Sequence, residues 1–228
     1  MLVIGHRGAR GLAPENTIES MDAAVKAGVS ILEFDIQITK DGIPVVIHDD
    51  NLKRTHNENI KISTITAKEL SRLTAKNNPV PTLKKVLDIY WKKIPLNIEV
   101  KGDKAGLPTA ELVSKYCKKP ADWNHCFISS YKPSELKEIH KFSPHTRLAM
   151  LHKYNSFKFI LYRNKINLFA VGWHQSYVNK AAIWLANKFG LFTYTYTINN
   201  PKSAQKLKSQ GINGVVTDFP DIIKKNMH

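Results

Sequence analysis

Short apolar runs alternate along the chain with segments of helical spacing, and this alternation restricts the folds that the chain can adopt. Each run has the four to eight residues of an ordinary strand. We expect strands at Leu2–Gly5, Ile31–Ile38, Pro44–Ile47, Leu96–Lys101, Cys126–Ser130, Arg147–Leu151, Leu168–Gly172, Phe192–Thr197 and Gly214–Thr217. Pro44–Ile47 follows the turn sequence Lys40-Asp41-Gly42 and is predicted to extend the second strand as a hairpin. Eight strands separated by helices then remain.

The predicted helices lie between these strands. They are Ile18–Ala27, Thr66–Leu73, Thr82–Tyr90, Thr109–Tyr116, Pro133–Lys141, Asn179–Phe189, Pro201–Ser209 and Pro220–Asn226. Thr66 and Glu69 have the spacing of a capping box at the start of the second. Strands that alternate with helices form parallel sheets, and 228 residues suit a small (β/α)8 barrel. An open, doubly wound sheet is the alternative.

The polarity of two strands favours the barrel. In Ile31–Ile38 and Leu96–Lys101, one face is apolar and the other is polar or charged. The strands of an open sheet that is covered on both sides would be apolar on both faces. A barrel interior can hold polar side chains near its mouth if they form a site. We therefore predict a single α/β domain over residues 1–228, a (β/α)8 TIM barrel with a small hairpin or loop insertion after the second strand.

Three carboxylates are expected to face one another in this barrel. Glu33 and Asp35 are two residues apart in one strand and share a face, and Glu99 lies on the polar face of the next barrel strand. Burying like charges without a partner is costly, and Lys101 supplies only one positive charge. A divalent cation would balance the three, and all-oxygen ligands favour Mg²⁺ or Ca²⁺ over Zn²⁺. The alternative is that they are solvated on an exposed antiparallel strand.

Two histidines follow apolar runs directly. His6 and His48 are therefore predicted at the carboxyl ends of strands, where barrels of this kind hold their active sites. An imidazole pKa of about 6.5 suits proton transfer. Arg7 lies between His6 and a glycine, and its guanidinium can bind a phosphate. Together with Lys101 and a metal ion, these residues predict an anion site and a phosphate ester as the substrate.

Several motifs in a fixed order carry a family resemblance. They are His6-Arg7-Gly8, Pro14-Glu15-Asn16-Thr17, Glu33-Phe34-Asp35, Thr39-Lys40-Asp41-Gly42, Val45-Val46-Ile47-His48-Asp49, Leu52-Lys53-Arg54-Thr55, Glu99-Val100-Lys101, Tyr196-Thr197-Ile198-Asn199 and the segment 213–220. The ordered set resembles the glycerophosphodiester phosphodiesterase family over almost the whole chain.

The resemblance implies an enzyme with a (β/α)8 barrel that uses a divalent cation, Mg²⁺ or Ca²⁺. Its reaction would be hydrolysis of glycerophosphodiesters to sn-glycerol 3-phosphate and an alcohol. The implied metal ligands are Glu33, Asp35 and Glu99. The implied general acid and base are His6 and His48, in either order, and the implied phosphate ligands are Arg7 and Lys101. Asp49 is expected to orient His48, and Asn16 to support the first loop.

The chain also departs from the family pattern. Tyr196 stands where the family has a tryptophan, and His56 interrupts the family's Arg-Thr-Thr. Only 50 residues lie between His48 and Glu99, so the lid over the mouth is expected to be small. Because of these departures, the resemblance does not specify which alcohol group the substrate carries. The expected substrates are glycerophosphocholine, glycerophosphoethanolamine or similar small phosphodiesters, with a lysophospholipase D activity as the alternative. His174, after the sixth barrel strand, is a weaker candidate for lining the substrate mouth.

The net charge of +15 raises a rival class, a non-catalytic protein that binds nucleic acid or an anionic surface. Residues 1–57, which hold most of the motifs, carry a formal charge of −2, and residues 58–228 carry +17. No helix-turn-helix, zinc-finger or aromatic RNA-binding pattern is present. We therefore expect no nucleic-acid partner, and the basic surface leaves room for peripheral contact with an anionic membrane.

The remaining composition is that of a cytoplasmic protein. The two cysteines, Cys117 and Cys126, are too few for a disulfide framework and are expected to be reduced thiols. No apolar run approaches the ~20 residues of a membrane span, and the amino terminus does not resemble a signal peptide. The tryptophans, together with Tyr194 and Tyr196, are interpreted as core residues. The tryptophans are Trp91, Trp123, Trp173 and Trp184.

Overall fold

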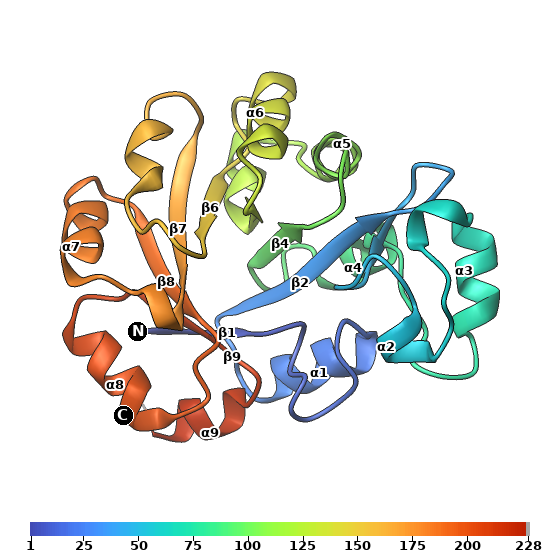
Figure 1. Cartoon of the computed structure of the whole chain (residues 1–228), viewed down its shortest axis with the longest axis horizontal. Coiled ribbons are helices and arrows are strands. Elements are labelled where there is room, and N and C mark those ends of the chain that lie inside the picture. The colour runs from blue at the N-terminus through green and yellow to red at the C-terminus, as the bar shows by residue number, and fades with distance from the viewer. Residues whose placement is uncertain (227–228) are drawn as a thin grey trace.

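A computed structural model describes residues 1–226 and shows a closed barrel of parallel strands surrounded by helices (Figure 1). The barrel strands are β1 (Leu2–Gly5), β2 (Ile31–Ile38), β4 (Leu96–Val100), β5 (Cys126–Ser130), β6 (Leu148–His152), β7 (Leu168–His174), β8 (Phe192–Tyr196) and β9 (Gly214–Thr217). They pair in that order, and β1 also pairs with β9, which closes the sheet. The predicted (β/α)8 barrel is confirmed, and the open sheet is wrong.

The hairpin after the second strand is also present. Strand β3 (Pro44–Val46) pairs antiparallel with β2. The chain between β3 and β4 forms α2 (Lys53–His56), the 3-10 turn η1 (Ile62–Thr64), α3 (Ala67–Thr74) and α4 (Leu83–Tyr90). Helix α3 begins with the predicted capping box. Leu52, Ile62 and Leu70 pack with β3 residues into a separate apolar cluster, so the insertion is small but folded around its own core.

The other helices surround the barrel. They are α1 (Ile18–Lys26), α5 (Gly106–Ser114), α6 (Pro133–Phe142), α7 (Lys180–Lys188), α8 (Pro201–Ser209) and α9 (Pro220–Lys225). Two 3-10 turns, η2 (Pro120–His125) and η4 (Gln175–Tyr177), precede β5 and α7. A third, η3 (Lys158–Leu161), stands between β6 and β7 where other units have an α-helix. The sequence predicted no helix there.

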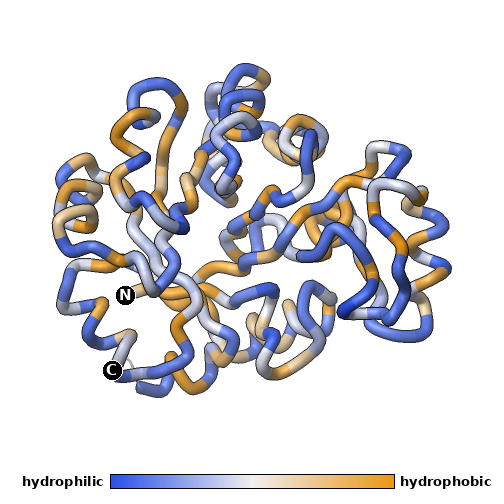
Figure 2. The backbone as a smooth tube through the Cα atoms, in the orientation of Figure 1, coloured by the Kyte–Doolittle hydropathy of each residue, from blue (hydrophilic) through white to orange (hydrophobic). Residues whose placement is uncertain are grey.

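The barrel has one apolar core outside its strands and another inside. Leu32, Phe34 and Ile36 of β2 face outward into the layer between strands and helices. Ile31 faces inward and packs with Tyr194 and other interior side chains. The opposite directions of these residues match the predicted alternation of β2. In Figure 2, the barrel strands contain many of the hydrophobic stretches of the chain. The apolar interior layer leaves the polar side chains of β2 and β4 nearer the carboxyl ends of the strands.

The core interpretation of the tryptophans is wrong for Trp184. Trp173 is completely buried, and Trp91 and Trp123 pack against the core. Trp184 is 61% exposed, because the buried face of α7 is formed by Ala182, Ile183 and Ala186.

The single domain was predicted over residues 1–228. Its helices and strands occupy Leu2–Lys225, and residues 227 and 228 lie outside the part of the chain that the structure describes. The outer domain boundary therefore stays a prediction. Within residues 1–226, no helix combines the length and the apolar composition needed to cross a membrane.

Candidate active site

Three carboxylates from two neighbouring strands form the centre of the site. Glu33 and Asp35 extend from β2, and Asp35 lies opposite Glu99 in the register of β2 and β4. One oxygen from each of the three side chains lies within 4.8 Å of the others. Glu33 is 3% exposed and Asp35 is 1% exposed. Since β2 is parallel to both β1 and β4, the alternative of an exposed antiparallel strand is wrong.

Two cations from neighbouring segments contact these carboxylates. The ammonium of Lys101 lies 3.3 Å from Asp35 and forms a close ion pair with Glu99. The guanidinium of Arg7 lies 3.2 Å from Asp35. Although burial opposes ionisation of Asp35, Lys101 and Arg7 hold the pKa of this carboxyl well below its usual range. Both predicted phosphate ligands therefore stand beside the predicted metal ligands.

Glu33 is not balanced in the same way. Its Oε2 accepts a hydrogen bond from the backbone N–H of Arg7 at 2.8 Å. Its buried Oε1 has no hydrogen-bond partner among the described residues. Burial, with the nearby charges of Asp35 and Glu99, raises the pKa of Glu33 well above its usual value. A buried oxygen without a partner and a surplus of negative charge fit a bound cation, and three carboxylates are ligands that Mg²⁺ and Ca²⁺ accept.

A carboxylate at the end of β9 holds His6. Nδ1 of His6 donates to Oδ1 of Asp218 at 2.5 Å. Asn199 donates to the other oxygen of Asp218 at 2.8 Å, and Arg10 lies 2.8 Å from Oδ1. Although burial opposes its ionisation, these partners lower the pKa of Asp218 to about 2. Burial lowers the pKa of His6 below 6.5, and the hydrogen bond that His6 donates to Asp218 opposes this shift.

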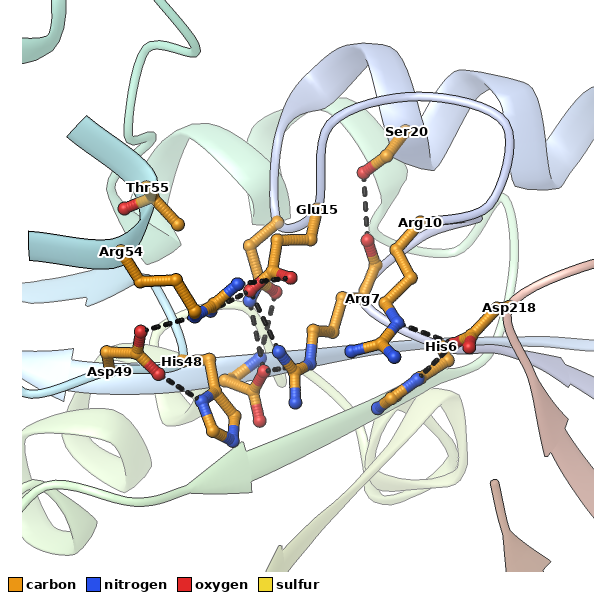
Figure 3. Close-up of polar contacts among 12 residues, drawn as sticks. His6, Arg7, Arg10, Glu15, Ser20, His48, Asp49, Arg54, Thr55 and Asp218 are labelled. Carbon is orange, nitrogen blue, oxygen red and sulfur yellow. Dashed lines mark hydrogen bonds and ion pairs between the residues drawn. The ribbon is translucent and has the colours of Figure 1, made fainter. Parts of the chain in front are cut away.

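His48 has a similar partner on the other side of Arg7 (Figure 3). Nδ1 of His48 donates to Oδ1 of Asp49 at 2.6 Å, as the sequence predicted. Arg54 donates to the second oxygen of Asp49 at 2.7 Å and also binds Glu15. Glu15 accepts a further bond from Arg7 at 2.8 Å. A chain of alternating charges thus links His48 to Arg7.

The turn between β1 and α1 positions Arg7. Arg7 itself has a φ of 51°, and Gly8 has a φ of 82°. A Cβ on Gly8 would lie 2.4 Å from Oγ of Ser20 and 2.5 Å from its backbone carbon, so only glycine fits. Asn16, at the end of the same turn, donates to Oδ2 of Asp35 at 3.0 Å. The asparagine therefore supports the carboxylate cluster as well as the loop.

A row of rings leads away from Lys101 along the carboxyl ends of β5, β7 and β8. The Lys101 ammonium lies 5.7 Å from the centre of the Tyr131 ring. Tyr131 contacts Tyr196 edge to face, with centroids 6.1 Å apart, and Tyr196 contacts His174 at the same distance. His174 thus lies beside the residue that replaces the family's tryptophan. These rings form one side of the approach to the carboxylates.

Sequence reasoning missed the partners of two functional side chains. Asp218 lies in the motif segment 213–220, and Glu15 and Asn199 lie in two other motifs, but the sequence predicts no role for any of the three. Asp218 directly follows an apolar strand, as His6 and His48 follow theirs. The same rule that singled out the histidines could therefore have found it. Glu15 could not be found in this way, because it lies in a loop and acts by joining two arginines.

A (β/α)8 barrel whose mouth gathers three carboxylates, an arginine, a lysine and two carboxylate-bound histidines defines a class of enzyme, the phosphodiesterases that require a metal ion. The particular family follows from comparison. Residues 6–222 match the Glycerophosphoryl diester phosphodiesterase family. The chain belongs to this family, which confirms the predicted resemblance and the prediction of an enzyme that hydrolyses glycerophosphodiesters.

Individual relatives agree with this assignment. The chain is 35% identical to the Bacillus subtilis protein named "Putative glycerophosphodiester phosphodiesterase YhdW", with 99% of this chain and 98% of the relative covered. A solved phosphodiesterase from Oleispira antarctica, in complex with the product sn-glycerol-3-phosphate, superimposes with a TM-score of 0.87 at 25% identity, covering 100% of this chain and 96% of the other. The human lysophospholipase D GDPD1 is 36% identical over 50% of this chain and 41% of its own length.

Proposed function

We propose that this enzyme hydrolyses small glycerophosphodiesters to sn-glycerol 3-phosphate and an alcohol, with His6 and His48 as its acid–base pair. The observation that carries the proposal is the paired arrangement of the two histidines. Each donates its Nδ1 proton to a carboxylate, so each ring is fixed in orientation and tautomer, with Nε2 at its opposite end. The two rings stand on opposite sides of Arg7 (Figure 3).

The other charged residues of the site would bind the phosphate and orient the two histidines. Arg7 and Lys101 would hold the nonbridging oxygens of the phosphate, since both are cationic and lie at the carboxylate cluster. One histidine would remove a proton from the attacking hydroxyl, and the other would protonate the departing alkoxide. Asp49 and Asp218 would keep the two rings in place. Asp218 would also favour the charged form of the His6 ring.

Glu33, Asp35 and Glu99 would hold one divalent cation, Mg²⁺ or Ca²⁺. When bound, this ion would polarise the phosphate and offset the negative charge that develops on its oxygens. Burial and the charges of Asp35 and Glu99 raise the pKa of Glu33, so three ionised carboxylates without a cation are unfavourable. Activity measured with each ion in turn decides between Mg²⁺ and Ca²⁺.

The test is an assay of hydrolysis with glycerophosphocholine and glycerophosphoethanolamine as substrates. The rate is measured from the release of glycerol 3-phosphate. We expect activity with Mg²⁺ or Ca²⁺ and none after exhaustive chelation. His6→Ala and His48→Ala should each lower kcat by about a hundredfold or more. His145→Ala, an exposed histidine beyond the opposite ends of the strands, is the matched control and should retain full activity. Wild-type rates in either site variant would disprove the scheme.

A lysophospholipase D activity is a second candidate. It is supported by the row of rings beside Lys101, which offers apolar surface to a larger substrate, and by the similarity to a human lysophospholipase D. Lysophosphatidylcholine, added to the substrate panel on the same preparation, tests it directly. A kcat/KM above that for glycerophosphocholine would make it the principal activity. The cytoplasmic location and the absence of a nucleic-acid partner stay predictions.

A further inference from the structure

One long stretch of the chain contains no acidic residue. Between Glu138 and Asp218 lie 79 residues with 11 lysines and arginines and no aspartate or glutamate. At the chain's average density, about seven acidic residues would be expected there. The stretch runs from the end of α6 to β9 and includes η3, α7 and α8. Its cations therefore have no carboxylate within their own segment to neutralise them.

The same stretch exposes the least buried large hydrophobic side chains in the described part of the molecule. Tyr154 is 69% exposed, Leu161 is 65% exposed and Trp184 is 61% exposed. Phe157, Ile160 and Tyr177 are also exposed. Single exposed hydrophobic residues are ordinary, but these fall within 31 residues of sequence. Their clustering calls for a physical explanation.

These side chains belong to two segments that pack together. Tyr154 contacts Tyr177, with ring centroids 5.2 Å apart, and the Ser156 hydroxyl donates to the backbone of Tyr177 at 2.6 Å. The Arg163 guanidinium lies 4.0 Å from the centre of the Phe189 ring at the end of α7. We call the exposed side chains of residues 153–165 and 177–188 the η3–α7 surface. Its exposed cations are Lys153, Arg163, Lys165, Lys180 and Lys188, and the half-buried Lys158 lies among them.

The composition of this surface indicates its partner. Lysine and arginine side chains reach lipid phosphates, while tryptophan, tyrosine and leucine enter the boundary between headgroups and acyl chains. Nucleic acid would use the cations and the rings, but it would gain little from Ile160 and Leu161. We propose that the η3–α7 surface binds a bilayer that contains anionic phospholipids.

This surface adjoins the approach to the active site. Tyr177 contacts His174, with ring centroids 6.0 Å apart, and His174 contacts Tyr196 at the mouth. A bilayer bound at Tyr154 and Tyr177 would lie beside the approach and bring the mouth close to the membrane. The binding itself does not depend on the reaction, so it can be measured without substrate.

The test is cosedimentation with vesicles of phosphatidylcholine alone and of phosphatidylcholine mixed with phosphatidylglycerol. We expect the wild type to bind only the mixed vesicles and to be released by salt. Lys153→Glu/Lys158→Glu and Leu161→Ser/Trp184→Ser should each weaken this binding by about tenfold or more. Lys153, Leu161 and Trp184 are exposed and Lys158 is half-buried, and thermal unfolding confirms that the variants fold.

The matched control changes the same charge at the opposite end of the molecule. Lys68→Glu/Lys76→Glu lies on and just after α3, far from α7 (Figure 1), and should bind vesicles within about twofold of the wild type. An equal loss in this control would mean that net charge alone drives binding, which overturns the proposal. Failure of the wild type to bind mixed vesicles would also overturn it. So would salt-sensitive binding of RNA that the same two surface variants abolish, without binding to vesicles.

Discussion

At the scale of single residues, each histidine of the site is hydrogen-bonded to a carboxylate that lies outside the cluster of Glu33, Asp35 and Glu99. Asp49 is the neighbour of His48 in sequence, whereas Asp218 reaches His6 from 212 residues away. Both carboxylates are held in turn by cations, Arg54 and Arg10. Such partners fix the tautomer of an imidazole and favour its protonated form. The roles of Asp49 and Asp218 can therefore be tested apart from the roles of the rings.

Asp218→Asn should lower kcat by about a hundredfold, with a smaller change in KM, because the His6 ring loses its anionic partner. Asp218 raises the pKa of His6 against the larger effect of burial. Its removal should therefore move the His6 limb of the pH–rate profile to lower pH. A base produces the acid limb and an acid produces the alkaline limb, so the limb that moves also assigns the role of His6.

The control for this prediction is Asp221→Asn, an exposed aspartate on α9. It changes the same charge three positions further on and should leave kcat and the profile unchanged. A profile for Asp218→Asn with both limbs in the wild-type positions would contradict the coupling to His6. A purely structural defect would lower the active fraction without moving either limb.

At the scale of elements, β2 shows what the sequence could reveal. Its alternation of apolar and polar residues predicted the barrel, placed Glu33 and Asp35 on one inner face and directed Phe34 outward. A strand has a period of two residues, so its faces can be assigned without knowing its neighbours. The contact between His6 and Asp218 depends on barrel closure, because β1 and β9 meet only when the sheet closes. Local patterns do not contain that information.

The turn between β1 and α1 offers a prediction at the same scale. Gly8→Ala should destabilise the protein by about 2 kcal/mol or more, because Gly8 has a positive φ and its Cβ would collide with Ser20. Gly42→Ala is a matched control, since Gly42 also has a positive φ but has no atom within 4 Å of the added Cβ. It should cost only about 1 kcal/mol.

Urea unfolding of the two glycine variants measures the difference. Only Gly8→Ala should also reduce activity, because its collision displaces the neighbouring Arg7. Equal losses of stability in the two variants would show that backbone conformation alone causes the destabilisation. The collision with Ser20 would then contribute nothing to it.

At the scale of the whole molecule, charge is divided between two regions. The barrel mouth concentrates negative charge in Glu33, Asp35 and Glu99, while the stretch from α6 to β9 is purely basic. The sequence predicted the first region from its spacing and located the excess positive charge only as far as residues 58–228. It could not predict the η3–α7 surface, because that surface depends on which side of α7 is buried and on the packing of η3 against it. Trp184, interpreted as core, is the residue that shows this most directly.

The carboxylate cluster should link the stability of the whole molecule to metal and to pH. The folded-state pKa of Glu33 is raised above 4.5, so its stabilising contribution is present below pH 4.5 and is lost as pH rises through the folded-state value. Where the proton is lost, a bound cation can offset the negative charge that remains on Glu33. We therefore expect Mg²⁺ or Ca²⁺ at about a hundred times its dissociation constant to raise the unfolding temperature by about 5–10 °C. The increment should shrink as the pH falls toward 4.5.

Scanning calorimetry across pH, with chelator and with each ion, measures this link. Glu33→Gln should raise the unfolding temperature of the metal-free protein at neutral pH and abolish most of the increment from metal, because it removes both the repulsion and a ligand. Glu111→Gln, at an exposed position of α5, should leave both quantities unchanged. A metal increment that is the same at neutral and acid pH, or that persists in Glu33→Gln, would show that the cation binds elsewhere. The unfolding temperature of the whole protein thus measures the competition between one proton and one cation at Glu33.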